Sequence, residues 1–255
     1  MKNKTVLITG AASGIGFSIA QLLAKQQASV IITDVSEEAA QQAKQTLIAE
    51  GFSVDAYKLD VTNENDIAHL VETLGNTPID ILINNAGIQH VSRLEEFPMG
   101  AWQKIVDILL TGPARTCKAI LPKMREHGFG RIINIGSIHG LVASPYKSAY
   151  VAAKHGLIGF SKVIALETAD CDITINTICP AYVKTPLVEK QIADQAKEHG
   201  ISEDEVIEKI MLAPMPKKAF IDMEEIAATV QFLASENARN MTGQALVLDG
   251  GWTVK

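Results

Sequence analysis

A serine, a tyrosine and a lysine near the middle of the chain have the residue types and spacing of an acid–base group. Tyr150 and Lys154 are four residues apart in a helix-like run, which places them on one helix face, one turn apart. Ser137 follows the strand-like run Arg131 to Ile135, and a short loop lets its hydroxyl face both side chains. An ammonium beside a phenol stabilises the phenolate and lowers the phenol's pKa from about 10. The three groups predict proton removal from an alcohol, with Ser137 bonded to the reacting oxygen.

A glycine-rich stretch between the first strand-like run and the first helix-like run predicts a phosphate site. Residues 9–16 read TGAASGIG, with the spacing GxxxGxG. Glycines in such a turn let backbone N–H groups approach a pyrophosphate, and the N-terminus of the following helix favours its charge. An ordinary strand-to-helix turn is the alternative interpretation of the pattern alone. We expect this loop to bind a dinucleotide through Gly10, Ser13, Gly14, Ile15 and Gly16.

Acidic and amide residues follow the next three strand-like runs. Asp34 ends the second run, about 20 residues past the glycines, where a carboxylate binds ribose hydroxyls and repels a 2′-phosphate. Asp34 therefore favours NAD over NADP, and its alternative role is a helix N-cap. Asp60-Val61 and the stretch 84–87 (NNAG) open toward the same crevice, unless they are ordinary turn residues.

The elements that must position these groups alternate between strand and helix patterns. Apolar, β-branched runs predict strands at 5–9, 29–33, 54–59, 80–83, 131–135, 173–178 and 245–248. Helices are predicted at 15–25, 37–50, 63–74, 99–126 (interrupted at Gly112-Pro113), 148–169 and 223–234. This order predicts a doubly wound parallel α/β sheet in a single domain, residues 1–255. The polar, helical insertion 182–218 follows a strand where ligands bind, so it is a candidate substrate lid.

Composition and charge argue against several classes of binding partner. The chain has 255 residues, 47% of them hydrophobic, and a net charge of −6. It has no run of Lys or Arg that favours nucleic acid or an anionic membrane, and no apolar run near the roughly 20 residues of a membrane helix. The three cysteines, Cys117, Cys171 and Cys179, lack metal-site spacing, so we expect no metal. Without a signal-peptide pattern, they favour reduced thiols in the cytoplasm.

Together these motifs resemble the short-chain dehydrogenase/reductase family over essentially the whole chain. The matching residues are TGAASGIG (9–16), Asp34, Asp60, NNAG (84–87), Ser137, the YxxxK motif of Tyr150 and Lys154, and PAYVKTP (180–186). The resemblance implies a Rossmann-type fold, NAD(P)-dependent oxidation of an alcohol or reduction of a carbonyl, and a homotetramer. It implies that the cofactor contacts Asp60, Val61, Asn85, Ala86, Gly87, Tyr150, Lys154, Pro180, Val183 and Thr185.

Position 109 departs from the family pattern. The family has an Asn at a helix kink seven residues past an aromatic or similar residue, where a main-chain carbonyl binds the water of a proton relay. Counting from Trp102 gives Leu109 here. Pro113 lies four residues on and cannot donate a helical hydrogen bond, so it leaves the Leu109 carbonyl free. Our hypothesis is that Gly112-Pro113 produces by backbone geometry what the Asn supports; the alternative is a kink without a relay.

Polar residues around the predicted centre suit a small carboxylate as substrate. They are Gln89, His139, Lys147 and, in the candidate lid, Gln191. One cation with several neutral donors binds a carboxylate, whereas a steroid or a long acyl chain needs an apolar cleft. Singly, each residue has a plainer interpretation: solvated surface for Lys147 and Gln191, a loop cap for His139, and a turn residue for Gln89.

Three stretches around these residues, 87–91, 137–156 and 180–196, closely resemble bacterial D-3-hydroxybutyrate dehydrogenases, a group within the same family. That resemblance assigns the four polar residues, with Ser137 and Tyr150, to substrate binding. It implies reversible oxidation of (R)-3-hydroxybutyrate by NAD⁺ to acetoacetate. Trp252 is either a pocket residue or a packing or subunit contact.

Three other functions stay open. A 3-oxoacyl-carrier-protein reductase needs NADPH, against Asp34, and a basic docking patch that the sequence lacks. A polyol dehydrogenase uses the polar pocket for hydroxyl groups. A non-catalytic NAD-sensing or scaffold protein is disfavoured by the intact Ser137, Tyr150 and Lys154, although Leu109 leaves it open.

Overall fold

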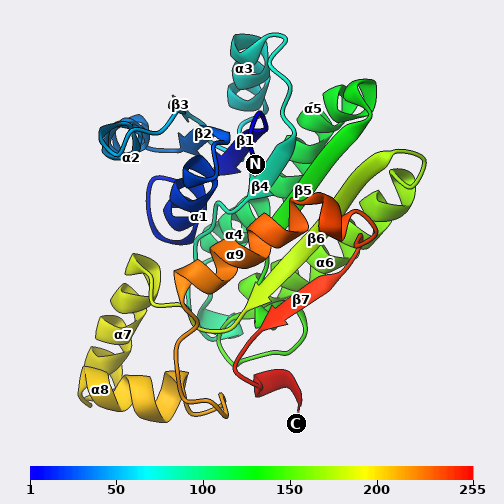
Figure 1. Ribbon diagram of the computed structural model, residues 1–255. Coiled ribbons are helices and arrows are strands. Elements are labelled where there is room, and N and C mark those ends of the chain that lie inside the picture. The colour runs from blue at the N-terminus through cyan, green and yellow to red at the C-terminus, as the bar shows by residue number, and fades with distance from the viewer. Residues whose placement is uncertain (255) are drawn as a thin grey trace.

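The computed structural model describes residues 1–254, without the side chains of Leu187, Lys190, Asp194, Glu198 and His199. Its strands form one parallel sheet in the order β3-β2-β1-β4-β5-β6-β7 (Figure 1). They are β1 (Thr5–Thr9), β2 (Ser29–Asp34), β3 (Val54–Lys58), β4 (Ile81–Asn84), β5 (Phe129–Ile135), β6 (Asp172–Pro180) and β7 (Ala245–Leu248). The doubly wound Rossmann-type fold is confirmed. The strand order reverses between β1 and β4, so ligands are expected at the carboxyl ends of these strands.

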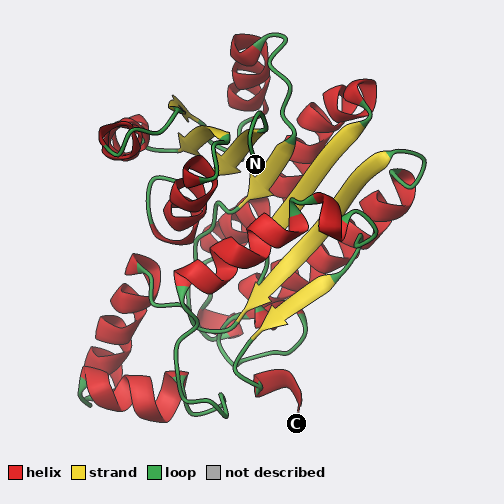
Figure 2. Cartoon of the chain, viewed as in Figure 1, coloured by secondary structure: helices red, strands yellow, loops and turns green. Residues whose placement is uncertain are grey.

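Helices cover both faces of this sheet (Figure 2). They are α1 (Gly14–Lys25), α2 (Glu37–Ala49), α3 (Glu64–Leu74), α4 (Met99–Val106), α5 (Gly112–His127), α6 (Ser148–Glu167), α7 (Pro186–His199), α8 (Glu203–Val206) and α9 (Met223–Leu233). Alternate residues of β1 feed two cores, because strand side chains alternate between faces. Val6 and Ile8 pack with α1, α2 and α9, whereas Leu7 packs with α3 and α5. Burial on both sides explains why the strands are continuously apolar.

The predicted helix 99–126 is two helices joined by a π-helical turn. The turn spans Asp107–Thr111, and the Gly112 N–H donates to the Asp107 carbonyl, five residues back. Pro113 lies in the first turn of α5, where its missing N–H is tolerated. A Cβ on Gly112 would lie 2.9 Å from Val61 Cγ2, so glycine lets this turn approach the loop after β3. Such π turns are frequent at functional sites.

Residues 182–218 form a helical unit beside the carboxyl ends of the strands (Figure 1). It contains α7, α8 and a second π-helical turn, Ile207–Met211. Ile192, Val206 and Met211 form its own apolar cluster, called the lid cluster below. Val183, Leu212 and Met215 of the same stretch pack in the main core, so the unit is anchored to the sheet near both of its ends. Its role as a lid stays a prediction.

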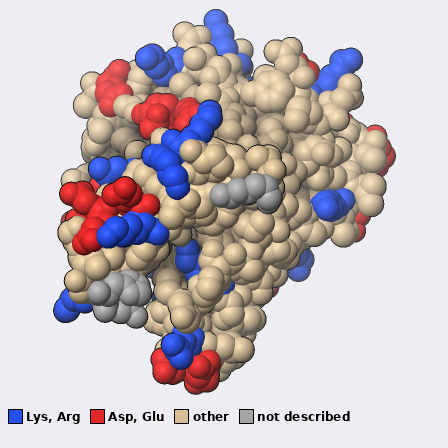
Figure 3. All heavy atoms as spheres, turned by 90° about the horizontal axis from the view of Figure 1, so that it is seen from below, with Lys and Arg blue, Asp and Glu red and all other residues tan. Residues whose placement is uncertain are grey.

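The next observations concern membrane-spanning helices, metal sites, free thiols and surface charge. No helix in residues 1–254 combines the length and apolar character needed to cross a bilayer. Among the side chains that the structure describes, no three from His, Cys, Asp or Glu are grouped to hold a metal ion. Cys117, Cys171 and Cys179 are free thiols. On the face shown in Figure 3, basic side chains stand beside acidic ones, not in one continuous basic patch.

Candidate active site

A cavity of about 440 Å³ opens at the carboxyl ends of β1, β4, β5 and β6. It brings together nearly all the residues that the sequence indicated. Its lining includes Gly10, Ser13, Gly14, Ile15, Asp34, Asp60, Val61, Asn85, Ala86, Gly87, Gln89, Leu109, Ser137, His139, Lys147, Tyr150, Lys154, Pro180, Val183, Thr185, Gln191 and Trp252. Gly16 is outside the lining, because it packs behind the loop: a Cβ there would lie 2.5 Å from Asn85 Nδ2.

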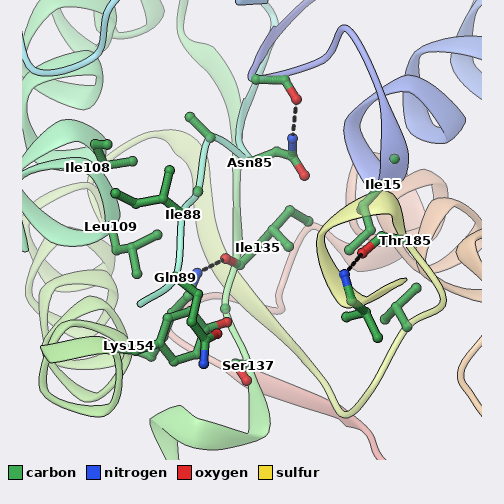
Figure 4. A pocket seen from close by; sticks show the side chains of 18 of the residues that line it. Ile15, Asn85, Ile88, Gln89, Ile108, Leu109, Ile135, Ser137, Lys154 and Thr185 are labelled. Atoms are coloured by element: carbon green, nitrogen blue, oxygen red, sulfur yellow. Dashed lines mark hydrogen bonds between the residues drawn. The ribbon is translucent and has the colours of Figure 1, made fainter. Parts of the chain in front are cut away.

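Asn85 ties the glycine loop to the end of β4. Its Nδ2 donates to the carbonyls of Thr9 (3.0 Å) and Gly10 (2.7 Å), and Figure 4 shows one dashed hydrogen bond from the Asn85 amide. Gly10 has φ +62°, and a Cβ on it would lie 2.7 Å from the Ala86 Cα. Only glycine therefore fits between the two loops at this point. The loops that follow β1 and β4 form one rigid wall of the cavity.

The N-terminus of α1 fits a phosphate group. Ser13 is its N-cap but makes no side-chain capping bond, and the first turn contains no acidic residue. By contrast, Ser36 caps α2 and Asn63 caps α3. Ser13, Gly14 and Ile15 line the cavity, so backbone N–H groups at this helix end are available to an anion there. The donor set suits a pyrophosphate.

Two aspartates lie at the same end of the cavity. Asp34 accepts hydrogen bonds from the Ser36 N–H (3.1 Å) and the Ala12 N–H (3.4 Å). The alternative that Asp34 caps α2 is wrong, because the Ser36 hydroxyl takes that role. Burial opposes ionisation of Asp60, but hydrogen bonds from the Thr62 hydroxyl and N–H lower the Asp60 pKa below its usual value. Both carboxylates can accept further hydrogen bonds from hydroxyl or amino groups.

The predicted acid–base residues meet at the centre of the cavity. Ser137 follows β5, while Tyr150 and Lys154 lie in the first two turns of α6. Lys154 is buried, and its ammonium donates to the Ile135 carbonyl at 2.6 Å (Figure 4). Its Nζ lies 5.6 Å from the centroid of the Tyr150 ring. Burial lowers the pKa of Lys154 to about 8.

The proton affinity of Tyr150 differs from the expectation. Burial raises its pKa to about 12, although a hydrogen bond with Ser137 opposes the rise. The expectation that Lys154 lowers the Tyr150 pKa is wrong for the chain by itself. Burial is the largest influence on the phenol, and the ammonium of Lys154 donates to the Ile135 carbonyl. The phenol therefore holds its proton at neutral pH until further charge enters the cavity.

His139 contacts Ser137 directly. The backbone N–H of His139 donates to Ser137 Oγ (3.2 Å), and the ring Nδ1 lies 3.3 Å from the same oxygen. Its Nε2 lies 2.8 Å from Ser144 Oγ. Burial, together with the charge of Lys147, lowers the pKa of His139 to about 3. The ring is therefore neutral in the physiological range, and His139 is more than a loop cap.

Lys147 and Gln89 place buried donors at the end of the cavity opposite the two aspartates. Lys147 is only 6% exposed, so the interpretation as a solvated residue is wrong. Its Nζ donates to the Tyr182 hydroxyl at 3.1 Å. None of the carboxylates in the described part of the chain forms an ion pair with it. Gln89 Nε2 is buried and has no acceptor among the same residues. Buried donors without acceptors are costly, so this region is suited to an anionic ligand.

An aromatic group closes this end of the cavity. The Trp252 ring centroid lies 5.9 Å from that of His139 and 5.9 Å from that of Tyr182. Trp252 is therefore a pocket residue of its own chain. Tyr182 was not predicted as a polar contact, although it lies within the PAYVKTP stretch. Ser144 was not predicted either, because no motif marks it and its contact arises from loop folding.

Leu109 lines the cavity from the π-helical turn and is 2% exposed. Figure 4 shows it beside Ile88 and Ile108, on the side of the cavity away from Ile15 and Thr185. Pro113 has no N–H to offer the Leu109 carbonyl. This arrangement is compatible with a relay through that carbonyl, which stays a prediction.

Comparisons with known proteins extend over the whole chain. A family model described as enoyl-(acyl carrier protein) reductase matches residues 10–253. The chain is 46% identical to the uncharacterized oxidoreductase YxjF of Bacillus subtilis (strain 168), with 100% of both chains covered. It is 43% identical to the D-beta-hydroxybutyrate dehydrogenase of Rhizobium meliloti (strain 1021), with 99% of both covered. Among solved structures, a variant of actinorhodin polyketide ketoreductase with NADPH matches with a TM-score of 0.94 at 33% identity, covering 99% of each chain.

The cavity and these full-length similarities lead to one conclusion. The glycine loop and the uncapped end of α1 suit a dinucleotide, and the acid–base residues lie in the same cavity. The chain is a member of the short-chain dehydrogenase/reductase family and an oxidoreductase with a nicotinamide cofactor.

Proposed function

We propose that the protein oxidises (R)-3-hydroxybutyrate reversibly to acetoacetate with NAD⁺. The observation that carries this proposal is a pair of buried donors: the Lys147 ammonium, which has no carboxylate partner among the described side chains, and Gln89 Nε2, which has no acceptor there. A carboxylate supplies both the charge and the acceptors that these buried groups need. The 43% identity to a D-beta-hydroxybutyrate dehydrogenase supports the same substrate.

We assign the other end of the cavity to NAD⁺. Asp34 supports this choice over NADP⁺, because its carboxylate at the end of β2 would repel a 2′-phosphate. When bound, the nicotinamide ring accepts the hydride from the substrate carbon. The residues proposed to hold the cofactor are Gly10, Ser13, Gly14, Ile15, Gly16, Asp34, Asp60, Val61, Asn85, Ala86, Gly87, Tyr150, Lys154, Pro180, Val183 and Thr185.

The residues of the chain manage the proton and the orientation. Tyr150 takes the hydroxyl proton, and Ser137 hydrogen-bonds the reacting oxygen as charge develops on it. A tyrosine with a pKa of about 12 needs more positive charge than Lys154 gives it in the chain by itself, and bound NAD⁺ would add such charge at its nicotinamide. Gln89, His139, Lys147 and Gln191 hold the carboxylate, so that binding remote from the reacting carbon fixes its orientation. Closure of residues 182–218 excludes water.

A reductase of carrier-linked 3-oxoacyl groups is the second candidate function. The structural match to a polyketide ketoreductase with NADPH favours it. Such a substrate is a thioester without a free carboxylate, however, and it would leave the Lys147 ammonium without a counter-charge. The two candidates therefore differ in both cofactor and substrate charge.

Initial rates measured through NADH absorbance separate the candidates. We expect oxidation of (R)-3-hydroxybutyrate with NAD⁺, with much lower rates for the (S) enantiomer, the methyl ester and NADP⁺. Faster reduction of a 3-oxoacyl thioester with NADPH would favour the second candidate, and activity only on sugar alcohols would favour a polyol dehydrogenase.

Lys147→Ala provides the test at the residue level. Removing a buried charge-assisted contact should raise the KM for the hydroxy acid about tenfold to 100-fold and lower kcat as well. The same variant should treat the methyl ester like the wild-type protein. Unchanged kinetics with the acid would remove Lys147 from the proposed site.

We also propose that the protein assembles as a homotetramer. Val163 (52% exposed) and Leu166 (80% exposed) lie on one outward face of α6. Exposed apolar side chains on one helix face commonly mark an interface, and symmetric homo-oligomers are the commonest assemblies.

A further inference from the structure

Tyr182 connects the carboxylate end of the cavity to residues 182–218. It lies in the loop between β6 and α7, and it packs against both the main core and the lid cluster. Its carbonyl accepts a hydrogen bond from the Ile221 N–H (2.9 Å), and the next residue, Val183, pairs with Ile221 in a parallel bridge. The backbone of Tyr182 is therefore fixed where the candidate lid joins the sheet.

The Tyr182 hydroxyl holds the Lys147 ammonium. The Nζ–O distance is 3.1 Å, and the Nζ lies 5.1 Å from the centroid of the Tyr182 ring. An ammonium has three donors. The contact with Tyr182 occupies one of them and leaves the others for a ligand. The Trp252 ring lies tilted by 30° beside the Tyr182 ring, and this contact restricts the directions in which the phenol can move.

Packing alone does not account for this hydroxyl. A phenylalanine ring would fill the same space between the core, the lid cluster and Trp252. The oxygen adds a polar contact to a buried cation that has no carboxylate partner among the described side chains. Since a long lysine side chain loses much rotamer freedom when its head is held, such a contact prepares the ammonium for a ligand.

We propose that Tyr182 is a positioning residue for carboxylate recognition. Its hydroxyl holds the Lys147 ammonium toward the substrate, and its ring couples occupation of that position to the lid cluster. This inference rests on the proposed function in one respect, namely that a carboxylate is the ligand. It adds a residue that acts through Lys147 and not on the reacting atoms.

The first experiment compares Tyr182→Phe with the matched control Tyr57→Phe. Tyr57 lies on β3, outside the active-site cavity. Tyr182→Phe should raise the KM for (R)-3-hydroxybutyrate about tenfold, the equivalent of one charge-assisted hydrogen bond, with a smaller change in kcat and none in the KM for NAD⁺. Tyr57→Phe should leave all three constants unchanged. Tyr182→Trp, which keeps the aromatic stack, serves if the Phe variant folds poorly.

A double-mutant cycle separates positioning from packing. In a Lys147→Met background, Tyr182→Phe should have no further effect on kcat/KM for the acid. The methyl ester of the substrate should not distinguish Tyr182→Phe from the wild-type protein. An equal loss in both backgrounds, or with the ester, would overturn the proposal in favour of a packing role.

Measuring substrate binding without turnover distinguishes failure of the Tyr182 inference from failure of the proposed function. Trp252 lies beside Tyr182, so its fluorescence should report titration with (R)-3-hydroxybutyrate, about tenfold weaker in Tyr182→Phe. Tyr182-dependent binding without oxidation would contradict the proposed function and support this inference. Oxidation with no effect of Tyr182→Phe would overturn the inference alone, and absence of any carboxylate binding would overturn both.

Discussion

Burial sets the proton affinities of three ionisable groups around the reacting position. It lowers the pKa of His139 to about 3 and that of Lys154 to about 8, and it raises that of Tyr150 to about 12. Each shift favours the uncharged form. Proton transfer to Tyr150 therefore depends on where the remaining positive charge lies, and Lys154 is the nearest cation on the same helix face.

Tyr150→Phe tests the proposed base. The ring packing is kept and the proton acceptor is lost, so kcat for oxidation should fall by about 10²-fold to 10⁴-fold. NADH binding, measured by its fluorescence enhancement, should stay close to the wild-type value. Substantial residual turnover would show that another group or water removes the proton.

His139 should make stability depend on acid. Its pKa is about 3 in the folded chain and 6.5 as an ordinary value, so between these limits the unfolded chain binds more protons. The free energy of unfolding therefore falls as the pH falls below 6.5, by about 2 kcal/mol at pH 5. Urea unfolding at pH 7 and pH 5 measures this loss.

His139→Asn is the matched variant for that measurement. It carries no titrating ring, so its loss of stability between the two pH values should be smaller by the same amount. An equal loss in both proteins would place the acid sensitivity in other groups.

The sequence predicted which segments are strands and which are helices better than it predicted where they end or how they bend. Strand β3 ends one residue before its predicted limit, and β6 extends beyond its predicted limits at both ends. Gly112-Pro113 marks a missing donor, which predicts an interruption. It does not predict that the wider turn lies before it, at Asp107–Thr111, because that depends on packing against Val61.

In the site, too, the sequence predicted which residues meet but not the properties that depend on their surroundings. The convergence of Ser137, Tyr150 and Lys154 follows from spacing and strand order, both of which are visible in the sequence. The pKa of Tyr150 was not predictable, because it depends on burial and on the competing Ile135 carbonyl. The Tyr182 hydroxyl was missed for a related reason, since its partner Lys147 is 35 residues away in the chain.

Pro113→Ala tests the π-helical turn as a functional element. Alanine restores an N–H four residues after Leu109, and a helical bond to the Leu109 carbonyl would close a water site there. We expect a lower kcat and a larger solvent isotope effect, with the KM for NAD⁺ unchanged.

A helix-favouring substitution outside the turn, Gly100→Ala in α4, is the control, since nothing lies within 4 Å of its added Cβ. Wild-type kinetics in Pro113→Ala would support the alternative of a kink without a relay.

At the scale of the whole molecule, the surface suggests how copies associate. The face of α6 that carries Val163 and Leu166 lies on the outside of the helical layer that covers the sheet. Exposure of Leu166 to water brings no favourable contact to the single chain. An interface there would also fix α6, the helix that carries Tyr150 and Lys154. Assembly and catalysis would then share one element.

Leu166→Glu should weaken this association. A charge in an apolar interface is costly to bury, so the particle mass in light scattering should fall from that of a tetramer to that of a smaller species. Gln42→Glu, on the exposed side of α2, controls for the added charge. An unchanged mass in Leu166→Glu would place the interface on another face.

The lid cluster gives the molecule two separate levels of opening. Ile192, Val206 and Met211 can separate while the two main cores stay packed. Mild denaturant or protease should therefore act on α7 and α8 before the sheet unfolds, whereas Val183, Leu212 and Met215 stay packed in the main core. If α7 and α8 act as the proposed lid, mutations in the lid cluster can change substrate entry, release and selectivity while the two main cores stay packed, so this segment is where one such scaffold can diverge in specificity.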